Sequence, residues 1–416
     1  MKKRTLVLGA LAFVCTASAG TYAVAQRVDA RRPTTVVVGS AAGPAATLRV
    51  DAQRSGLAPV AFPKPPLKID WRKPVGSTID QSPLAQGDNV VVLTGRGEIY
   101  WHGADGAETG KVFLGIGAAG SPIILSDGTV VVVSSTGEVV GARREGVVRF
   151  RVALGSDRTA LLGSSPLALL DGGFVLAYGT DLLVLDGEGN VRSRTTAPEA
   201  PVGPLASADG RIYFASAAGV VYSWNAGRDV VRVGSFGGVL DGGMALEGSR
   251  TAYAIVDGSR LVALDLAKGV ALPRATLALG GFLGPPAVRN GSASLMAAVP
   301  GRTFAMTIDG NGVETLRVPL TAPSLSFLTL GDGGTAVFTI PNHTGVLVDT
   351  TGAIAYASPE GVVGVIDATG VAQSLGETPC PKGGGSGGVT AILPAGPGAL
   401  VVACRAGSIV RVVGSN

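Results

Sequence analysis

Apolar residues in this chain come in short runs separated by glycine-containing turns. One unit reads Val130-Val131-Val132-Val133, then Ser134-Ser135-Thr136-Gly137, then Glu138-Val139-Val140. Two apolar runs joined by a tight turn with glycine are typical of a β-hairpin. The unit recurs, and we count eight such hairpins. Their turns are centred on Gly97, Gly137, Thr180, Gly219, Gly258, Gly301, Gly361 and Gly407.

The spacing of these turns predicts the fold. Successive turns lie 40, 43, 39, 39, 43, 60 and 46 residues apart. A period near 40 residues with four strands per unit is typical of a propeller blade. We therefore predict an all-β protein, an eight-bladed antiparallel β-propeller, with seven blades as the alternative. The interval of 60 residues is too short for two blades and is expected to hold an inserted hairpin, Leu325–Leu330 with Ala336–Ile340.

Residues at the corners of each unit fit this interpretation. A proline precedes the first strand in several units, where its missing amide donor matters least. Asx-Gly turns follow, which suit two-residue hairpins with positive φ. The prolines lie in Ser82-Pro83-Leu84, Ser121-Pro122-Ile123, Ser165-Pro166-Leu167, Gly203-Pro204-Leu205 and Pro285-Pro286-Ala287. The turns are Gly87-Asp88, Asp127-Gly128, Asp171-Gly172, Asp209-Gly210 and Asn290-Gly291.

The third strand of several units ends in an aspartate followed by a glycine. The carboxylate can accept backbone N–H bonds across the turn, and the glycine can take the left-handed conformation. We predict a repeated structural turn rather than a site of chemistry. Its residues include Asp186, Asp265, Asp309, Asp367, Gly269 and Gly370.

The two ends of the propeller are predicted to meet. The last unit has only three strands, Val389–Leu393, Ala399–Ala403 and Ser408–Val413. Leu67–Trp71 reads as a strand without preceding partners. Pairing it with Ser408–Val413 would complete the last blade, close the ring and remove exposed edges.

The N-terminus is typical of an exported protein. Met1–Arg4 is basic, the apolar run from Thr5 to Ala19 is short for a membrane span, and Ala23-Val24-Ala25 is a small-x-small site. These features predict a signal peptide over residues 1–25. An uncleaved anchor and lipidation at Cys15 are alternatives. We expect a flexible tether over 26–47 and the propeller over 48–416.

Cysteine count and charge narrow the picture further. Loss of Cys15 with the signal leaves Cys380 and Cys404, an even count in an exported protein, which predicts a disulfide. Two free buried thiols are the alternative.

The net charge of +4 falls to +1 without Lys2, Lys3 and Arg4 (4 − 3), and a near-neutral chain gives no electrostatic reason to expect nucleic acid as a partner.

Candidate catalytic groups are few. His102 and His343, the two histidines, are both expected to be solvent-facing turn residues. No HExxH or Cys/His cluster is present, and Lys382 precedes its glycine run instead of following it. The acidic turns at Asp186 and Asp309 lack EF-hand spacing. We predict no catalytic, cofactor-binding or metal-binding residue.

The repeated units resemble the pyrroloquinoline-quinone-like propeller repeat, from about Leu48 to Val413. Asp51–Pro59 followed by Leu67–Trp71 is similar to the opening of many proteins of this group. Quinone-dependent dehydrogenases with this repeat hold their cofactor between a tryptophan and a vicinal disulfide, with calcium and a catalytic aspartate. This chain has no adjacent cysteines, and Leu114, Phe150 and Ser374 stand at the expected tryptophan positions. The resemblance thus implies the fold without the cofactor.

We therefore expect an exported, non-catalytic scaffold that binds protein partners in the cell envelope. Size and the Arg54-Ser55-Gly56 opening also resemble the propeller subunit of the outer-membrane β-barrel assembly machinery. A quinone-dependent dehydrogenase and a small-ligand binder are alternatives, although few aromatic residues disfavour sugar stacking. The expected location is periplasmic, outer-membrane-associated or secreted, with membrane association only through partners or through an uncleaved or lipidated N-terminus.

Overall fold

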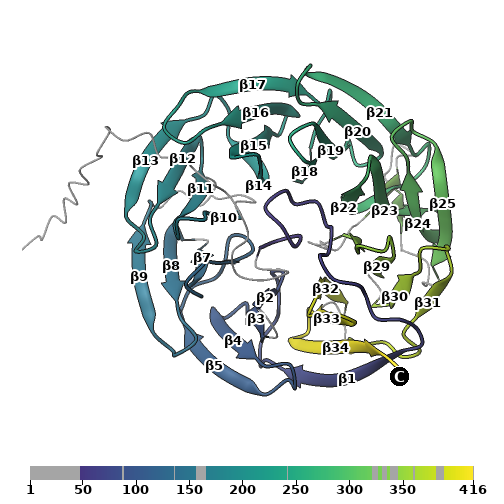
Figure 1. The fold of residues 1–416 in the computed structure, drawn as a ribbon, viewed down its shortest axis with the longest axis horizontal. Coiled ribbons are helices and arrows are strands. Elements are labelled where there is room, and N and C mark those ends of the chain that lie inside the picture. Colours follow the sequence, from purple (N-terminus) through teal and green to yellow (C-terminus); the bar gives the residue numbers. More distant parts are fainter. Residues whose placement is uncertain are drawn as a thin grey trace, which may run out of the picture.

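The strands form a closed ring of blades around a central axis (Figure 1). The computed structural model describes residues 47–86, 89–134, 136–155, 165–240, 242–320, 327–329, 335–337, 345–358, 361–380 and 388–415. Eight four-stranded antiparallel sheets make up the ring, and they confirm the predicted eight-bladed propeller. The predicted signal peptide and residues 26–46 of the predicted tether lie outside the described residues, whereas Thr47, the last residue assigned to the tether, is buried against the ring.

Seven of the eight blades consist of four consecutive strands, ordered from the axis outward. The first three are β2 (Leu84–Gln86), β3 (Asn89–Leu93), β4 (Glu98–His102) and β5 (Glu108–Phe113); β6 (Ile123–Ile124), β7 (Val130–Val133), β8 (Glu138–Ala142) and β9 (Val148–Ala153); and β10 (Leu167–Ala168), β11 (Phe174–Tyr178), β12 (Asp181–Leu185) and β13 (Val191–Thr196).

The next four blades follow the same order. They are β14 (Pro201–Ala208), β15 (Arg211–Ser216), β16 (Val220–Trp224) and β17 (Val230–Ser235); β18 (Ala245–Glu247), β19 (Thr251–Val256), β20 (Arg260–Asp265) and β21 (Val270–Thr276); β22 (Gly281–Arg289), β23 (Ser292–Val299), β24 (Arg302–Ile308) and β25 (Glu314–Leu320); and β28 (Leu347–Val348), β29 (Ile354–Ala357), β30 (Val363–Ile366) and β31 (Ala372–Ser374).

The eighth blade closes the ring as predicted. Its inner strands are β32 (Val389–Pro394), β33 (Ala399–Cys404) and β34 (Ser408–Gly414), and its outer strand is β1 (Leu67–Pro74). Strand β1 runs antiparallel to β34, with Leu67 opposite Gly414 and Pro74 opposite Ser408. Both ends of the chain therefore share one sheet, and the ring has no open blade edge at the junction.

The predicted inserted hairpin is also present. Strands β26 (Phe327–Thr329) and β27 (Thr335–Val337) pair with each other between β25 and β28. They are shorter than the predicted Leu325–Leu330 and Ala336–Ile340, and they form a two-stranded sheet of their own. The 60-residue interval thus contains one blade and one insertion.

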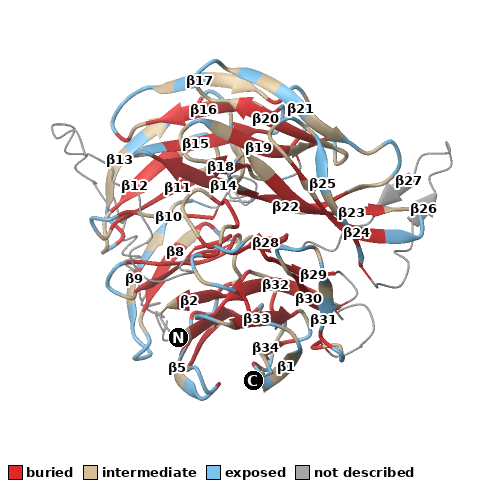
Figure 2. Ribbon diagram, turned by 45° about the vertical axis from the view of Figure 1, so that its right-hand side comes forward, coloured by how far each residue is buried: buried red, intermediate tan, exposed pale blue. Residues whose placement is uncertain are grey.

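The hydrophobic core lies between neighbouring blades. Inner and middle strands are apolar on both faces because each blade packs against two others; all four residues of β7, for example, are buried. Outer strands are more exposed to solvent and carry charged side chains, as in β13, whose sequence is VRSRTT. Buried residues therefore concentrate near the axis and exposed ones on the outer strands (Figure 2).

Two corner predictions need correction. Asp209-Gly210 and Asn290-Gly291 are two-residue turns with positive φ at both positions, as predicted. At Asp127 and Asp171, positive φ belongs to the following glycine alone, because longer loops join these strands.

The second correction concerns prolines. Pro204 and Pro286 do not begin their strands but lie inside β14 and β22. Both strands shift register there, between Val202 and Ala206 and between Leu283 and Ala287. A bulge tolerates the missing amide donor, which explains how proline fits within a strand.

Candidate functional site

The repeated aspartates lie in separate turns and shape their own loops. The carboxylate Oδ1 of Asp309 accepts hydrogen bonds from the amides of Asn311 and Val313 at 2.9 and 2.8 Å. Asp186, Asp265 and Asp367 accept equivalent bonds two and three or four residues ahead. These bonds lower the pKa of Asp309, chiefly through the Val313 amide. Gly269 and Gly370 have φ of +69° and +90°. Each carboxylate thus organises the backbone of its own turn.

Potential metal-ligating side chains stay apart in the described part of the chain. It contains no group of three His, Cys, Asp or Glu side chains arranged to hold a metal ion. His343 lies outside the described residues. His102 contradicts the expectation of a solvent-facing residue: it ends β4 with only 3% exposure, and its Nδ1 lies 3.2 Å from the carbonyl oxygen of Gly106. Burial lowers the pKa of His102, which favours the neutral ring.

The predicted cysteine pair comes together in the closing blade. The sulfurs of Cys380 and Cys404 are 2.14 Å apart and their Cα atoms 5.3 Å apart, which is disulfide geometry. Both residues are buried, and they share an apolar cluster with Val50, Ala58 and Phe62 from the start of the described chain. The cysteines are 24 positions apart in sequence, so this bridge is not the vicinal disulfide of the quinone-dependent enzymes.

The main feature that sequence reasoning missed lies on the propeller axis. Residues Thr47–Phe62, here called the central segment, run through the middle of the ring before the chain turns outward to β1 (Figure 1). Backbone carbonyls of this segment accept hydrogen bonds from the inner strands of four successive blades. The pairs are Ala52 with the Ser207 amide (2.7 Å), Gln53 with Leu246 (2.9 Å), Ser55 with Val288 (2.8 Å) and Gly56 with Val348 (2.9 Å).

Two buried arginines attach the same segment to the blades. The guanidinium of Arg54 donates to the carbonyls of Leu205 and Pro166, both at 2.9 Å, in two different blades. It also donates to Thr47 Oγ1 and, at 2.9 Å, to the Leu48 carbonyl. Arg49 donates to the carbonyl of Pro285 at 3.1 Å and to that of Pro286. The accepting carbonyls belong to three of the proline-containing sequences noted above, at residues 165–167, 203–205 and 285–287.

Burial dominates the electrostatics of the central segment. It lowers the pKa of Arg49 to about 9 and that of Arg54 to about 10. Burial likewise raises the pKa of Asp51, against hydrogen bonds from the Ser55 amide (2.9 Å) and hydroxyl. Carbonyl oxygens accept hydrogen bonds from both guanidinium groups and hold them in fixed positions, and the nearby charge of Asp51 favours their protonated forms.

The central segment engages the ring unevenly. In the three blades formed by β2–β13, the innermost strands carry other residues at the register position that Ser207 occupies in β14. These residues are Ala85, Ile124 and Ala168. Among the described residues, their amides have no backbone partner outside their own sheets. Within the described residues, backbone hydrogen bonds thus join the segment to one side of the ring, while the Arg54 side chain reaches the other side at Pro166.

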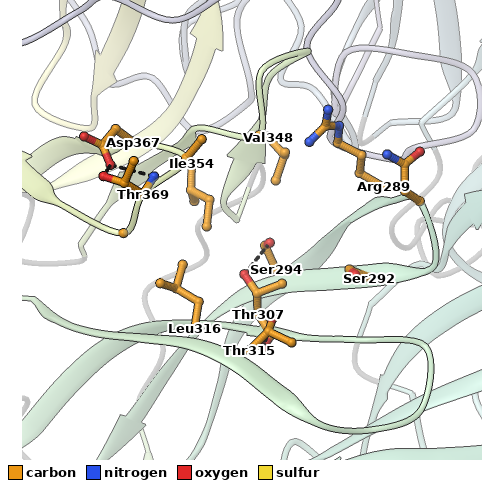
Figure 3. A pocket seen from close by; sticks show the side chains of 14 residues that line it. Arg289, Ser292, Ser294, Thr307, Thr315, Leu316, Val348, Ile354, Asp367 and Thr369 are labelled. Atoms are coloured by element: carbon orange, nitrogen blue, oxygen red, sulfur yellow. Dashed lines mark hydrogen bonds between the residues drawn. The ribbon is translucent and has the colours of Figure 1, made fainter.

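One surface cavity lies between the blades β22–β25 and β28–β31 (Figure 3). Its volume is about 410 Å³, within the range of small-ligand sites. Ser294 and Thr307 face Val348 and Ile354 across it, and Arg289 lies at one side. The Ser294 and Thr307 hydroxyls are 2.9 Å apart.

Comparisons with known proteins agree with the repeat interpretation. Residues 67–269 match the family model described as outer membrane protein assembly factor BamB. No curated protein matches the chain. The chain is thus similar to a PQQ-like propeller of the BamB type over about half its length.

Solved structures show the same fold at low identity. BamB from Moraxella catarrhalis has a TM-score of 0.56 and 14% identity, over 83% of this chain and 97% of that chain. The designed Ika8 protein has a TM-score of 0.60 and 15% identity, over 82% and 98%. A quinohemoprotein alcohol dehydrogenase from Pseudomonas putida HK5 has a TM-score of 0.62 and 11% identity, over 90% and 81%.

At these identities the likeness establishes the propeller fold alone, since scaffold and enzyme share it. A separate observation concerns membranes. Within the described ranges, no helix has the length and apolar character needed to cross one.

Proposed function

We propose that this protein is a non-catalytic scaffold that binds protein partners in the cell envelope. The observation that supports this most is the filled axis of the ring. Thr47–Phe62 occupies the centre with buried, hydrogen-bonded arginines, so the rigid blades present their outer faces and loops for contact.

A role as an outer-membrane protein assembly factor is the more specific form of this proposal. It is favoured by the match of residues 67–269 to the assembly-factor family and by the likeness to BamB from Moraxella catarrhalis. An envelope location, periplasmic or attached to the outer membrane, goes with that role and with the predicted signal over residues 1–25.

Quinone-dependent catalysis is less well supported by the residues present. The Cys380–Cys404 bridge is not vicinal, and Leu114 and Phe150 are buried apolar residues where the enzymes carry tryptophan. Arg49 and Arg54 hold the central segment on the axis. These residues do not fit the quinone and its calcium ion.

Affinity purification tests the proposal. The full chain with a C-terminal tag is expressed in its native envelope, and its partners are captured after mild crosslinking and identified by mass spectrometry. A tagged periplasmic protein of unrelated fold is the control. Specific recovery of outer-membrane assembly proteins supports the assembly role, and other specific envelope proteins support only the scaffold. Absence of any specific partner contradicts both.

A parallel measurement addresses catalysis. Purified full-length protein is mixed with pyrroloquinoline quinone and calcium, and its absorbance is followed after gel filtration. We expect no retained quinone. Stoichiometric retention with alcohol-dependent dye reduction would contradict the non-catalytic assignment.

A further inference from the structure

Register relates the cavity beside Ser294 to the two preceding blade interfaces. In three successive blades, an alanine of the inner strand pairs with one residue of the second strand. The pairs are Ala206 with Tyr213, Ala245 with Tyr253 and Ala287 with Ser294. The residue after each alanine donates its amide to the central segment, which confirms that the positions are equivalent. Two tyrosines and one serine therefore occupy the same structural position.

Tyr253 shows what this position does when an aromatic ring fills it. The side chain is 3% exposed and packs with Phe282 and Val288 of the following blade. Its hydroxyl lies 3.2 Å from the carbonyl oxygen of Gly291, in the first turn of that blade, and 3.4 Å from Glu247 Oε2. The ring thus fills the space between two blades, and the hydroxyl joins their polar edges.

Tyr213 occupies the preceding interface in the same way. It is also 3% exposed and belongs to a cluster with Met244 and Leu246 of the next blade. Two consecutive interfaces are therefore completed by a tyrosine from the same register position. The next interface follows the same backbone pattern but lacks that ring.

Ser294 leaves the corresponding space open. Its hydroxyl extends only to Thr307 of its own blade. Arg289, which corresponds by register to Glu247, reaches the following blade instead and donates to the Thr350 carbonyl at 2.7 Å. Apolar side chains of Leu316, Val348 and Ile354 line the cavity beneath this polar mouth.

We propose that this cavity binds a tyrosine side chain of a protein partner, an inference that rests on the proposed scaffold function. The phenol ring packs between Leu316 and the pair Val348 and Ile354, as Tyr253 packs between its own blades. Its hydroxyl meets the polar mouth near Arg289 and Thr350.

Other ligand classes suit the cavity less well. A phenylalanine ring has no hydroxyl and would therefore gain no hydrogen bond at the polar mouth. A sugar could meet the polar side chains of Ser292, Thr315 and Asp367, but its hydroxyls would also lie against the apolar side chains of Val348 and Ile354. A para-substituted phenol matches both these apolar side chains and the mouth.

Ligand-observed NMR on the full chain tests the site with N-acetyl-L-tyrosinamide. Comparison probes are N-acetyl-L-phenylalaninamide and methyl glucoside. We expect saturable binding of the tyrosine probe, at least about fivefold tighter than the other two. Ser294→Tyr fills the cavity from within and should weaken this binding at least about tenfold. Ser294→Ala, the matched control, keeps the cavity open and should stay within about threefold of wild type.

A second variant creates the site instead of blocking it. Tyr253→Ser should open an equivalent cavity one blade earlier and raise the stoichiometry of the tyrosine probe from one to two. Thermal unfolding of each variant shows whether it remains folded. If Tyr253→Ser does not fold, the Ser294→Tyr and Ser294→Ala pair still decides the proposal.

Three outcomes would overturn the site: no saturable binding to wild type, equal binding to Ser294→Tyr, or tighter binding of either comparison probe. Partner capture separates the site from the scaffold function. Equal capture by wild type and Ser294→Tyr would leave the scaffold standing and refute the cavity as its contact. Tyrosine binding without any captured partner would support the site and contradict the scaffold.

Discussion

Arginine occurs in two contrasting environments in this protein: buried at the propeller axis and exposed on the outer strands. Arg54 is fully buried and donates to carbonyl oxygens in two blades. Arg149 lies on the outer strand β9, has a side chain 25% exposed, and pairs with Asp127 and Glu188. Within one ring, carbonyl partners thus accompany the buried cation and carboxylates accompany the exposed one.

This difference predicts how much each kind of arginine contributes to the stability of the fold. A buried guanidinium must have its donors satisfied, so removing it leaves carbonyls without partners in a region that water does not reach. An exposed ion pair gains little because water competes for both charges. Charges on the outer strands have another effect, since they discourage pairing with strands of other molecules.

Deleting the central segment together with part of β1 should have the largest effect. Removal of residues 1–71 eliminates all bonds of Thr47–Phe62 to the inner strands and most of the pairing with β34. We expect the melting temperature, measured by circular dichroism, to fall by at least about 10 °C.

The control for this deletion removes only residues 1–46. Because the described contacts begin at Thr47, its melting temperature should remain within about 2 °C of that of the full chain. Similar melting temperatures for the two deletions would contradict the central segment as a structural element.

Arg54→Met comes next, because it keeps most of the side-chain volume while removing every donor. Carbonyls of Pro166, Leu205 and Leu48 would lose their partner. We expect a loss of roughly 3–5 kcal/mol in the free energy of unfolding, measured in urea. Lys64→Met, at an exposed position of the chain just after this segment, is the matched control and should change it by under about 0.5 kcal/mol. A loss below about 1 kcal/mol for Arg54→Met would show that burial does not distinguish these cations.

The disulfide lies in the closing blade, against which Phe62 of the central segment packs, and its contribution to stability can be compared with that of the buried arginines. Replacing Cys380 and Cys404 together by serine should reduce the free energy of unfolding by roughly 3–4 kcal/mol, by the chain-entropy argument for a loop of this length. Thiol titration of protein made in an oxidising compartment should find no free thiol. Two titratable thiols would refute the bridge.

Arg149→Met should have the smallest effect. It breaks exposed contacts with Asp127 of its own blade and with Glu188 of the next blade. We expect a loss of about 0.5–1 kcal/mol at low salt, which disappears near 1 M sodium chloride because the charges are screened. A loss as large as that for Arg54→Met, or one insensitive to salt, would mean that exposure does not separate the two sets of arginines.

Much of the fold could be predicted because each blade carries its own local signals. Val130–Val133, its glycine turn and the next apolar run specify a hairpin without help from distant residues. Ring closure was predictable because a three-stranded last blade needs a partner. The Cys380–Cys404 pair was predictable because these are the two cysteines left once Cys15 is assigned to the predicted signal peptide.

The axis and the cavity could not be predicted in the same way. Arg49 and Arg54 bind backbone carbonyls, which every residue possesses, so no complementary side chain marks their partners in the sequence. The cavity arises from a serine where two other blades have tyrosine, and this absence becomes visible only after the strand register aligns the blades. His102 was wrongly predicted to be a solvent-facing turn residue because the sequence alone does not show where the apolar strand ends and the turn begins.

Amide hydrogen exchange, followed by mass spectrometry of the full chain, tests the central segment most directly. The amides of Ser207, Leu246, Val288 and Val348 donate to it, whereas the equivalent amides of Ala85, Ile124 and Ala168 do not. We predict that the first four exchange much more slowly than the other three, and that Arg54→Met accelerates the exchange of the four. Equally fast exchange in both groups of the wild-type protein would contradict a central segment bound to one side of the ring.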